Sequence, residues 1–236
     1  MPWYELIGFG PKGWGPAIVT ATGMTVAVSV LALLIGAVFG ALGAWAKLGG
    51  SRSARWLADA YTTVLRGIPD LLVIYLLYFG GSAVLTNIGH RFGAEGFIGV
   101  NAFVTGALAV GIVSGAYQTE VFRAAYLAIA RGELEAARAC GMSGWTLLRR
   151  IIAPQVARFA IPGIGNVWQL VLKESALISV TGLTELLRQA QVASGSTRQP
   201  FVFYCTAAAV YLLLTFASTL LFDRAERFAM RGVRRV

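Results

Sequence analysis

The feature that most constrains this chain is the stretch from Ala17 to Ala46, which carries no charged side chain. An α-helix crosses the roughly 30 Å hydrocarbon core of a membrane in about 20 residues, so this stretch is long enough to span. Of the 236 residues, 57% are hydrophobic and 13% are charged, whereas a typical soluble domain carries about 25% charged residues. We therefore interpret the chain as a membrane protein with little room for a separate soluble domain.

Apolar regions recur along the sequence and predict an all-α, polytopic membrane fold with about five transmembrane helices. The regions are Ala17–Ala46, Leu57–Leu85, Asn101–Tyr126, Ile151–Leu172 and Phe201–Phe222. Within the second, Gly67 and Pro69 predict a break or kink, because proline lacks a backbone donor. The stretch 176–183 is too short to cross alone, so it is expected to be re-entrant or interfacial, and polar loops are expected at 86–100 and 185–200.

Small residues mark one face of the first span. Gly36, Gly40 and Gly43 follow the spacing that lets membrane helices approach closely. The pattern alone leaves two partners open with equal weight, because this face can pack within the subunit or against another chain.

The basic residues predict the orientation, since cytoplasmic segments of membrane proteins are enriched in Lys and Arg. One set of segments carries Lys47, Arg52, Arg55, Arg123, Arg131, Arg138, Arg149, Arg150, Arg224, Arg227, Arg231, Arg234 and Arg235. The opposite set carries only Lys12, Arg91, Arg188 and Arg198. We therefore predict a periplasmic N-terminal segment at 1–16 without a cleavable signal, one transmembrane domain at 17–226 and a cytoplasmic basic tail at 227–236.

Residues for catalysis, metal binding or nucleic-acid binding are not found in the sequence. There is no Gly-xxxx-Gly-Lys-Ser/Thr motif, so we do not expect the chain to bind ATP. Cys140 and Cys205 lack metal-ligand spacing, and the lone His90 falls in a predicted loop, where a surface role is the simplest interpretation. No nucleophile–base pair supports an intramembrane enzyme, and no basic patch is interleaved with aromatic residues as in nucleic-acid binding.

A cytoplasmic segment between the third and fourth spans predicts a short stiff helix at about 133–144. Glutamates at its start suit the positive end of the helix dipole, and its alanines favour the helical state. Gly141 is a natural terminator. Small residues at 136, 137 and 139 would let this helix sit in a groove of another protein.

Several motifs resemble the bacterial ABC-importer permease family. The signature loop of those permeases is matched by Glu135, Ala136 and Ala137, then by Gly141, Ile151 and Pro154. The runs at 61–70, 115–123, 162–169 and 173–179 resemble the polar-amino-acid branch, which includes permeases for histidine, lysine/arginine/ornithine, arginine, octopine and nopaline. Glu174 departs from the branch, where a smaller or amide residue is more frequent.

The resemblance implies the transmembrane domain of a type I importer in the bacterial inner membrane. It implies a second permease subunit, expected to be a related chain although a second copy is the alternative. It also implies two ATPase subunits that bind ATP and Mg²⁺ and a periplasmic binding protein. This chain itself would need no cofactor. An ion-coupled secondary transporter is the alternative, but it predicts two related halves, and no repeat is seen.

Charged and polar residues in or near the spans are candidates for the solute pathway or its gate, because buried charge in a membrane needs a partner or water. Arg66 and Asp70 could pair across one helical turn or act in gating. Glu120, near the end of the third span, is expected to snorkel or to pair with Arg123.

The fourth span supplies the remaining candidates. Asn166, Gln169 and Lys173 share a helix face, which could line the pathway or form interhelical hydrogen bonds. If the solute is a cation, Glu174 and Asp70 are the carboxylates expected to meet it.

Overall fold

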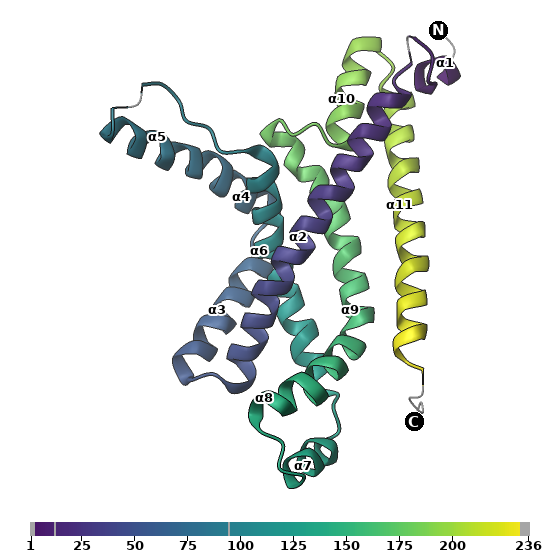
Figure 1. Cartoon of the computed structure of the whole chain (residues 1–236). Helices are drawn as coiled ribbons and strands as arrows, with labels where there is room; N and C mark the ends of the chain where they lie inside the picture. The colour runs from purple at the N-terminus through teal and green to yellow at the C-terminus, as the bar shows by residue number, and fades with distance from the viewer. Residues whose placement is uncertain (1–2, 12, 94, 232–236) are drawn as a thin grey trace.

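The computed structural model describes residues 3–11, 13–93 and 95–231, and over this part of the chain it contains helices and no strand (Figure 1). The predicted all-α fold is therefore confirmed. The α-helices are α1 (Trp3–Ile7), α2 (Gly15–Gly49), α3 (Arg52–Gly67), α4 (Asp70–Tyr75), α5 (Gly81–Arg91), α6 (Ala102–Leu127), α7 (Arg131–Ala139), α8 (Gly144–Leu147), α9 (Ala153–Glu174), α10 (Leu186–Thr197) and α11 (Pro200–Ala229). Two π-helical turns, η1 (Leu76–Gly80) and η2 (Leu148–Ile152), and one 3₁₀ helix, η3 (Ser175–Thr181), complete the order.

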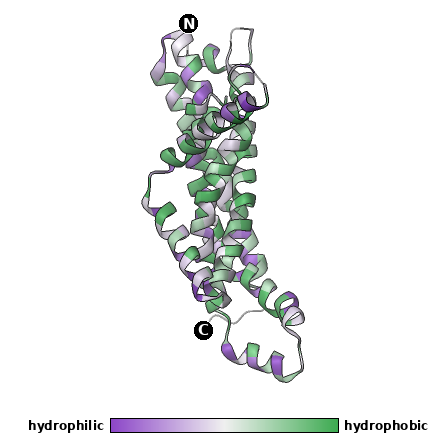
Figure 2. Ribbon diagram, turned by 90° about the vertical axis from the view of Figure 1, so that its left-hand side faces the viewer, coloured by the Kyte–Doolittle hydropathy of each residue, from purple (hydrophilic) through white to green (hydrophobic). Residues whose placement is uncertain are grey.

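Four helical segments of the described chain are long and apolar enough to cross a membrane: Gly15–Gly49, Asp70–Arg91, Ala102–Leu127 and Pro200–Ala229. The predicted fourth span corresponds to α9, which has 22 residues but is not one of these four segments. Polar residues such as Arg158, Asn166 and Gln169 reduce its hydropathy. Figure 1 nevertheless shows α9 running the length of the bundle between α6 and α11. In Figure 2 hydrophobic residues dominate the middle of the molecule and polar residues gather toward its ends.

The apolar segment of the second region begins at Asp70, whereas the sequence predicted a span from Leu57 to Leu85. The break itself occurs where the sequence predicted it, because α3 ends at Gly67 and Pro69 precedes α4. Helix α3 is amphipathic, burying only Ala58 and Thr62 on the face toward its neighbours. Its buried face packs beside α2 and α6.

The glycine face of α2 packs within the subunit, against α6. A Cβ atom added at Gly36 would lie 3.1 Å from the carbonyl oxygen of Gly111 and closer still to Ser114 Oγ. In the other direction, a Cβ added at Gly111 would lie 2.7 Å from Ile35 Cγ2. Glycines on both helices therefore allow the two backbones to approach, and this pair forms the centre of the bundle.

Residues 185–200, predicted as a loop, contain α10. The Glu185 side chain caps this helix by accepting hydrogen bonds from the backbone N–H groups of Leu187 (2.8 Å) and Arg188 (2.7 Å). Tyr211 of α11 donates to the same carboxylate at 3.2 Å. The buried residues Leu186, Ala190 and Ala193 hold the helix against the bundle. The Ser- and Gly-rich composition of this segment predicted a loop, but tertiary packing stabilises a helix there.

Two segments remain, the short apolar stretch at 176–183 and the predicted loop at 86–100. Most of the short apolar stretch at 176–183 forms η3, in which Ile178 is fully inaccessible and packs where Gly106 leaves space, whereas Val180 is exposed. One side of this stretch therefore belongs to the core, and its re-entrant or interfacial position stays a prediction. The predicted loop at 86–100 is shorter, because α5 continues to Arg91. His90 lies in the last turn of α5, and its ring bonds Gly96 O at 3.0 Å in an exposed position.

Replacing Glu185 by alanine is expected to loosen α10. The change removes the helix cap and leaves the Tyr211 hydroxyl without this acceptor, which costs about 1–2 kcal/mol. The measurement is the thermal midpoint of the purified protein in detergent, with Gln191→Ala on the same helix as the matched control. If both variants melt like the unchanged protein, Glu185 does not hold α10.

Candidate functional site

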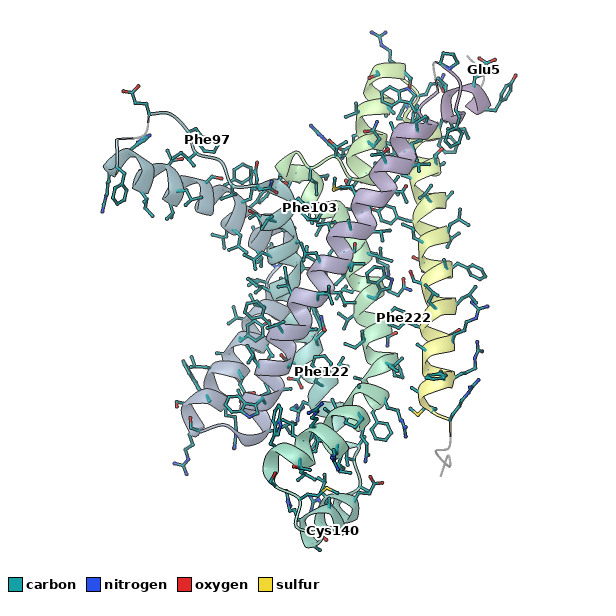
Figure 3. All side chains as sticks on the ribbon, viewed as in Figure 1. Glu5, Phe97, Phe103, Phe122, Cys140 and Phe222 are labelled. Carbon is teal, nitrogen blue, oxygen red and sulfur yellow. The ribbon has the colours of Figure 1, made fainter. Side chains whose placement is uncertain are left out.

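The segment after α6 folds as two short helices at one end of the molecule, beyond the membrane-spanning part (Figure 1). The single helix predicted at 133–144 is therefore wrong in its extent. Helix α7 ends at Ala139, a turn follows, and α8 begins at Gly144. Figure 3 places Cys140 at the tip of this segment and Glu5 at the opposite end of the molecule.

Gly141 terminates α7, as the sequence predicted. Its φ of 76° lies in the left-handed region, which favours glycine. The amide of Gly141 donates to Arg138 O at 2.9 Å, and that of Met142 donates to Ala137 O at 3.2 Å. This pair of hydrogen bonds is the Schellman arrangement that closes a helix C-terminus. The turn after α7 therefore has a defined geometry.

Helix α7 is fastened to the base of α9. Leu134 and Ala137 are buried in a cluster with Leu147, and Ile151 packs against that cluster. At the start of α7, Gln155 of α9 donates a hydrogen bond to the Glu133 carboxylate. A force applied to α7 would therefore reach α9 through both contacts.

The exposed face of α7 differs from the predicted one in one residue. Ala137 faces its own subunit, so its small side chain serves internal packing rather than a groove in another protein. Glu135, Ala136 and Ala139 are exposed. Beside them, Trp145 of α8 is 70% exposed. Sequence reasoning did not single out Trp145, because spacing does not reveal which side of a short helix faces outward.

The junction between α8 and α9 is the π-helical turn η2. The N–H of Ala153 donates to Leu148 O, one residue further back than in an α-helix. Pro154 follows immediately and has no N–H to donate, so the regular pattern cannot continue through it. Pro154 is exposed, whereas Ile151 is half-buried. Proline therefore marks the start of α9 and the change in backbone geometry there.

Two carboxyl groups face each other where α4 meets the end of α9. Asp70 is the first residue of α4 and Glu174 is the last residue of α9. Glu174 is 5% exposed, and neither of its side-chain oxygens has a hydrogen-bond partner among the described residues. Asp70 is near enough to interact with it electrostatically. Burying a carboxyl without a donor is costly, so this pair is suited to meeting a cation.

Arg66 does not form the predicted ion pair with Asp70. The helix is interrupted between them at Ile68 and Pro69, so the two side chains no longer face each other across a turn. Instead the Arg66 guanidinium lies 5.2 Å from the centroid of the Tyr117 ring on α6. This is a cation–π geometry.

Glu120 belongs to an ion-pair network that joins three helices. The predicted pair with Arg123 is present, with Arg123 Nη2 2.9 Å from Glu120 Oε2. Lys47 of α2 approaches Glu120 Oε1 at 2.7 Å and Asp59 Oδ1 of α3 at 2.9 Å. Lys47 also donates to Thr62 Oγ1 at 2.7 Å. Residue spacing could not indicate this role for Lys47, because its partners are far away along the chain.

Tyr61 gives α3 a second attachment to α6. Its hydroxyl donates to Ile112 O at 2.6 Å, and burial raises the pKa of Tyr61 to about 12. The phenol therefore remains protonated and keeps this hydrogen bond at physiological pH.

Replacing Lys47 by methionine is expected to weaken the attachment of α3 to α2 and α6. Lys47 is 10% exposed in its side chain, so losing its ion pairs and hydrogen bond costs about 2 kcal/mol. Thermal unfolding in detergent measures the loss. Arg224→Met, which removes an exposed cation without an ion pair in the described residues, is the control. Equal midpoints for both variants would contradict a stabilising role for the network.

The predicted pathway residues of α9, Asn166, Gln169 and Lys173, differ in their surroundings. Gln169 donates to Thr219 Oγ1 at 3.3 Å and to Thr215 O at 3.4 Å, both on α11. This is the interhelical alternative that the sequence left open. Asn166 is exposed and lines a small cavity of about 210 Å³ with Gln169 and residues of α11. Lys173 is exposed. Gln169 therefore bonds to α11, whereas a pathway face shared by the three residues stays a prediction.

The long helices α2, α6, α9 and α11 form a bundle, and the α7–α8 segment is fastened to it at the start of α9. The chain belongs to the family of binding-protein-dependent transport system inner membrane components, whose model matches residues 36–234. It is 62% identical over 235 residues to an octopine transport system permease protein of Rhizobium meliloti, covering 100% of this chain and 99% of that one. A histidine/lysine/arginine/ornithine transport system permease protein of Escherichia coli is 34% identical over 223 residues, which cover 94% of this chain and 97% of that one.

A solved structure supports the same assignment. The crystal structure of an amino acid ABC transporter with histidines matches with a TM-score of 0.75 and 33% sequence identity, over 91% of this chain and 94% of that chain. The family and fold resemblance are confirmed: the chain is the permease component of an ABC importer and spans the membrane several times. ATP hydrolysis lies in separate subunits, and family membership decides against the secondary transporter considered above.

Proposed function

We propose that this permease carries a basic amino acid or an opine across the inner membrane. The relatives named for octopine and for histidine, lysine, arginine and ornithine support this class, because the named amino acids are basic and octopine is a guanidinium compound. The observation that carries the proposal is the buried Glu174 carboxyl, which has no hydrogen-bond donor in the described chain and faces Asp70. A guanidinium or ammonium group would supply the missing donors and charge.

The proposed orientation puts the N-terminus in the periplasm and the C-terminus in the cytoplasm. The 47–55 connection, the α7–α8 segment and the end of α11 lie at one end of the bundle, and α10 lies at the other (Figure 1). The first end holds most of the basic residues named above, which favours the cytoplasm. Lys12, Arg234 and Arg235 lie outside the described residues, as do parts of the predicted terminal segments 1–16 and 227–236.

The partners follow from this orientation. Two ATPase subunits that bind ATP and Mg²⁺ would each receive one α7–α8 segment, with Glu135, Ala136 and Gly141 at or beside the contact. A second permease, proposed to be a related chain, would complete the pathway, and a periplasmic binding protein would deliver the solute. Anionic lipid would surround the basic cytoplasmic end. Nucleic acid has no role.

The proposed mechanism is alternating access driven from the cytoplasm. Closure of the ATPase pair would move α7, and the Leu134 cluster and the Glu133–Gln155 bond would pass that movement to α9. Because α9 packs on α6 and ends at Glu174, the movement would change access to the carboxyl pair. Ile151 and Pro154 would set the angle between the α7–α8 segment and α9.

The test is solute uptake by the complete transporter carrying Glu174→Gln or Asp70→Asn. Each change removes a negative charge from the proposed cation site, so uptake at low solute concentration is expected to fall at least about tenfold. Glu95→Gln in the exposed outer loop is the control. Unchanged affinity and rate in both variants would discard the assignment of these carboxyl groups.

A further inference from the structure

A polar cavity of about 420 Å³ lies between α2, α3 and α6. Its lining includes Lys47, Thr63, Arg66, Tyr117 and Glu120. The cavity is open, and its lining residue Lys47 lies in the last turn of α2, next to the 47–55 connection. It is therefore a water-accessible chamber on the proposed cytoplasmic side of the carboxyl pair.

The charged side chains that line this cavity differ in whether they form an ion pair. Lys47 is held by Asp59 and Glu120, and Glu120 is also held by Arg123. Arg66 alone has no carboxylate within ion-pair distance in the part of the chain that the structure describes. The exposed Arg66 side chain places its guanidinium over the Tyr117 ring, 5.2 Å from the ring centroid. Ring stacking leaves the edge of a guanidinium free, and that edge can donate two parallel hydrogen bonds to a carboxylate.

Tyr117 connects the cavity to the carboxyl pair. Its side chain lies in the electrostatic range of Asp70 and Glu174 and also of Arg66. Tyr117 is therefore close to a pair of carboxyl groups and close to the guanidinium of Arg66. A solute that carries a cationic end and a carboxylate end is complementary to these charges.

We propose that Arg66 binds the carboxylate of the transported solute, so that the cavity is a second solute subsite next to the Asp70–Glu174 pair. The inference rests on the proposed function, because it assigns the other end of the same solute. The cationic group meets the carboxyl pair, and the carboxylate is held at Arg66 against the Tyr117 ring. This subsite discriminates amino acids and opines from simple amines.

The experiment compares two probes on the assembled permease–ATPase complex in lipid nanodiscs without the binding protein. The probes are L-arginine and agmatine, which is arginine without its carboxylate. Arg66→Gln is expected to weaken arginine binding about tenfold or more while leaving the weaker agmatine binding unchanged. Arg66→Lys keeps the charge but not the planar fork, so an intermediate loss of arginine affinity is expected. Glu174→Gln should weaken the binding of both probes.

The outcomes separate the two proposals. If Arg66→Gln weakens the binding of arginine and of agmatine equally, or leaves the binding of both unchanged, Arg66 does not bind the carboxylate and the subsite is overturned. If Glu174→Gln changes neither probe while Arg66→Gln still selects against arginine, the carboxyl pair fails and the Arg66 subsite stands. Absence of arginine binding to the unchanged complex at millimolar concentration overturns both. Basal ATPase activity and monodispersity check that each variant is folded.

Discussion

Replacement of Gly36 by leucine is expected to prevent α2 from pairing with α6 and to remove most of the folded protein. Any side chain at this position meets Ser114, Gln118 and the backbone of α6. The two backbones would have to separate, and overpacking of this kind costs about 3 kcal/mol. Because α2 and α6 form the central pair, the loss extends to the helices packed on them.

Gly23 on the same helix provides the control. A Cβ added there meets nothing within 4 Å, and the position is exposed. Gly23→Leu should therefore give the same yield of membrane-inserted protein as the unchanged sequence, and a single peak in detergent size-exclusion chromatography. A Gly36→Leu protein that behaves like Gly23→Leu would show that the close α2–α6 contact is not needed.

Reversal of the charge at Glu135 is expected to uncouple the permease from its ATPase. Glu135 is exposed on α7, and its side chain forms no hydrogen bond or ion pair within the part of the chain that the structure describes, so Glu135→Lys leaves the internal packing of α7 intact. A charge reversal in a docking surface places like charges together or leaves a partner unpaired. We expect uptake and ATPase co-purification to fall at least about tenfold.

Gly141→Asp tests the same surface through a negative charge placed in the turn after α7. Aspartate and asparagine both adopt the left-handed conformation of Gly141 more readily than other side chains. Gly141→Asn is the matched control, since it has nearly the same shape as aspartate and carries no charge. For the charge reversal, Glu5→Lys at the opposite end is the control. Normal uptake in both Glu135→Lys and Gly141→Asp would end the coupling proposal.

The features that the sequence predicted are those with a local or compositional cause. Uncharged runs predicted the spans, Pro69 predicted the interruption in the second region, and Gly141 predicted the end of α7. The pairing of Glu120 with Arg123 followed from their separation by one helical turn. The family motif identified the α7 segment because it consists of fixed residues at fixed offsets.

The features that it missed depend on contacts between distant segments. Lys47 and Glu120 lie 73 positions apart, and periodicity cannot reveal such a pair. Helix α10 depends on Glu185 and on burial against α2 and α11, which outweigh its unfavourable composition. The direction of Ala137, inward rather than toward a partner, depends on how α7 lies against α9. Residue spacing alone does not fix that orientation.

Cys140, a free and exposed thiol at the tip of the α7–α8 segment, allows a direct measurement of the central claim. With Cys205 replaced by alanine, a membrane-impermeant maleimide is applied to sealed vesicles of opposite orientation, with and without the ATPase subunits. We predict labelling of Cys140 only when the cytoplasmic face is outside, and protection of Cys140 when the ATPase is bound. Labelling from the periplasmic face, or equal labelling with and without the ATPase, would contradict a coupling role for this segment.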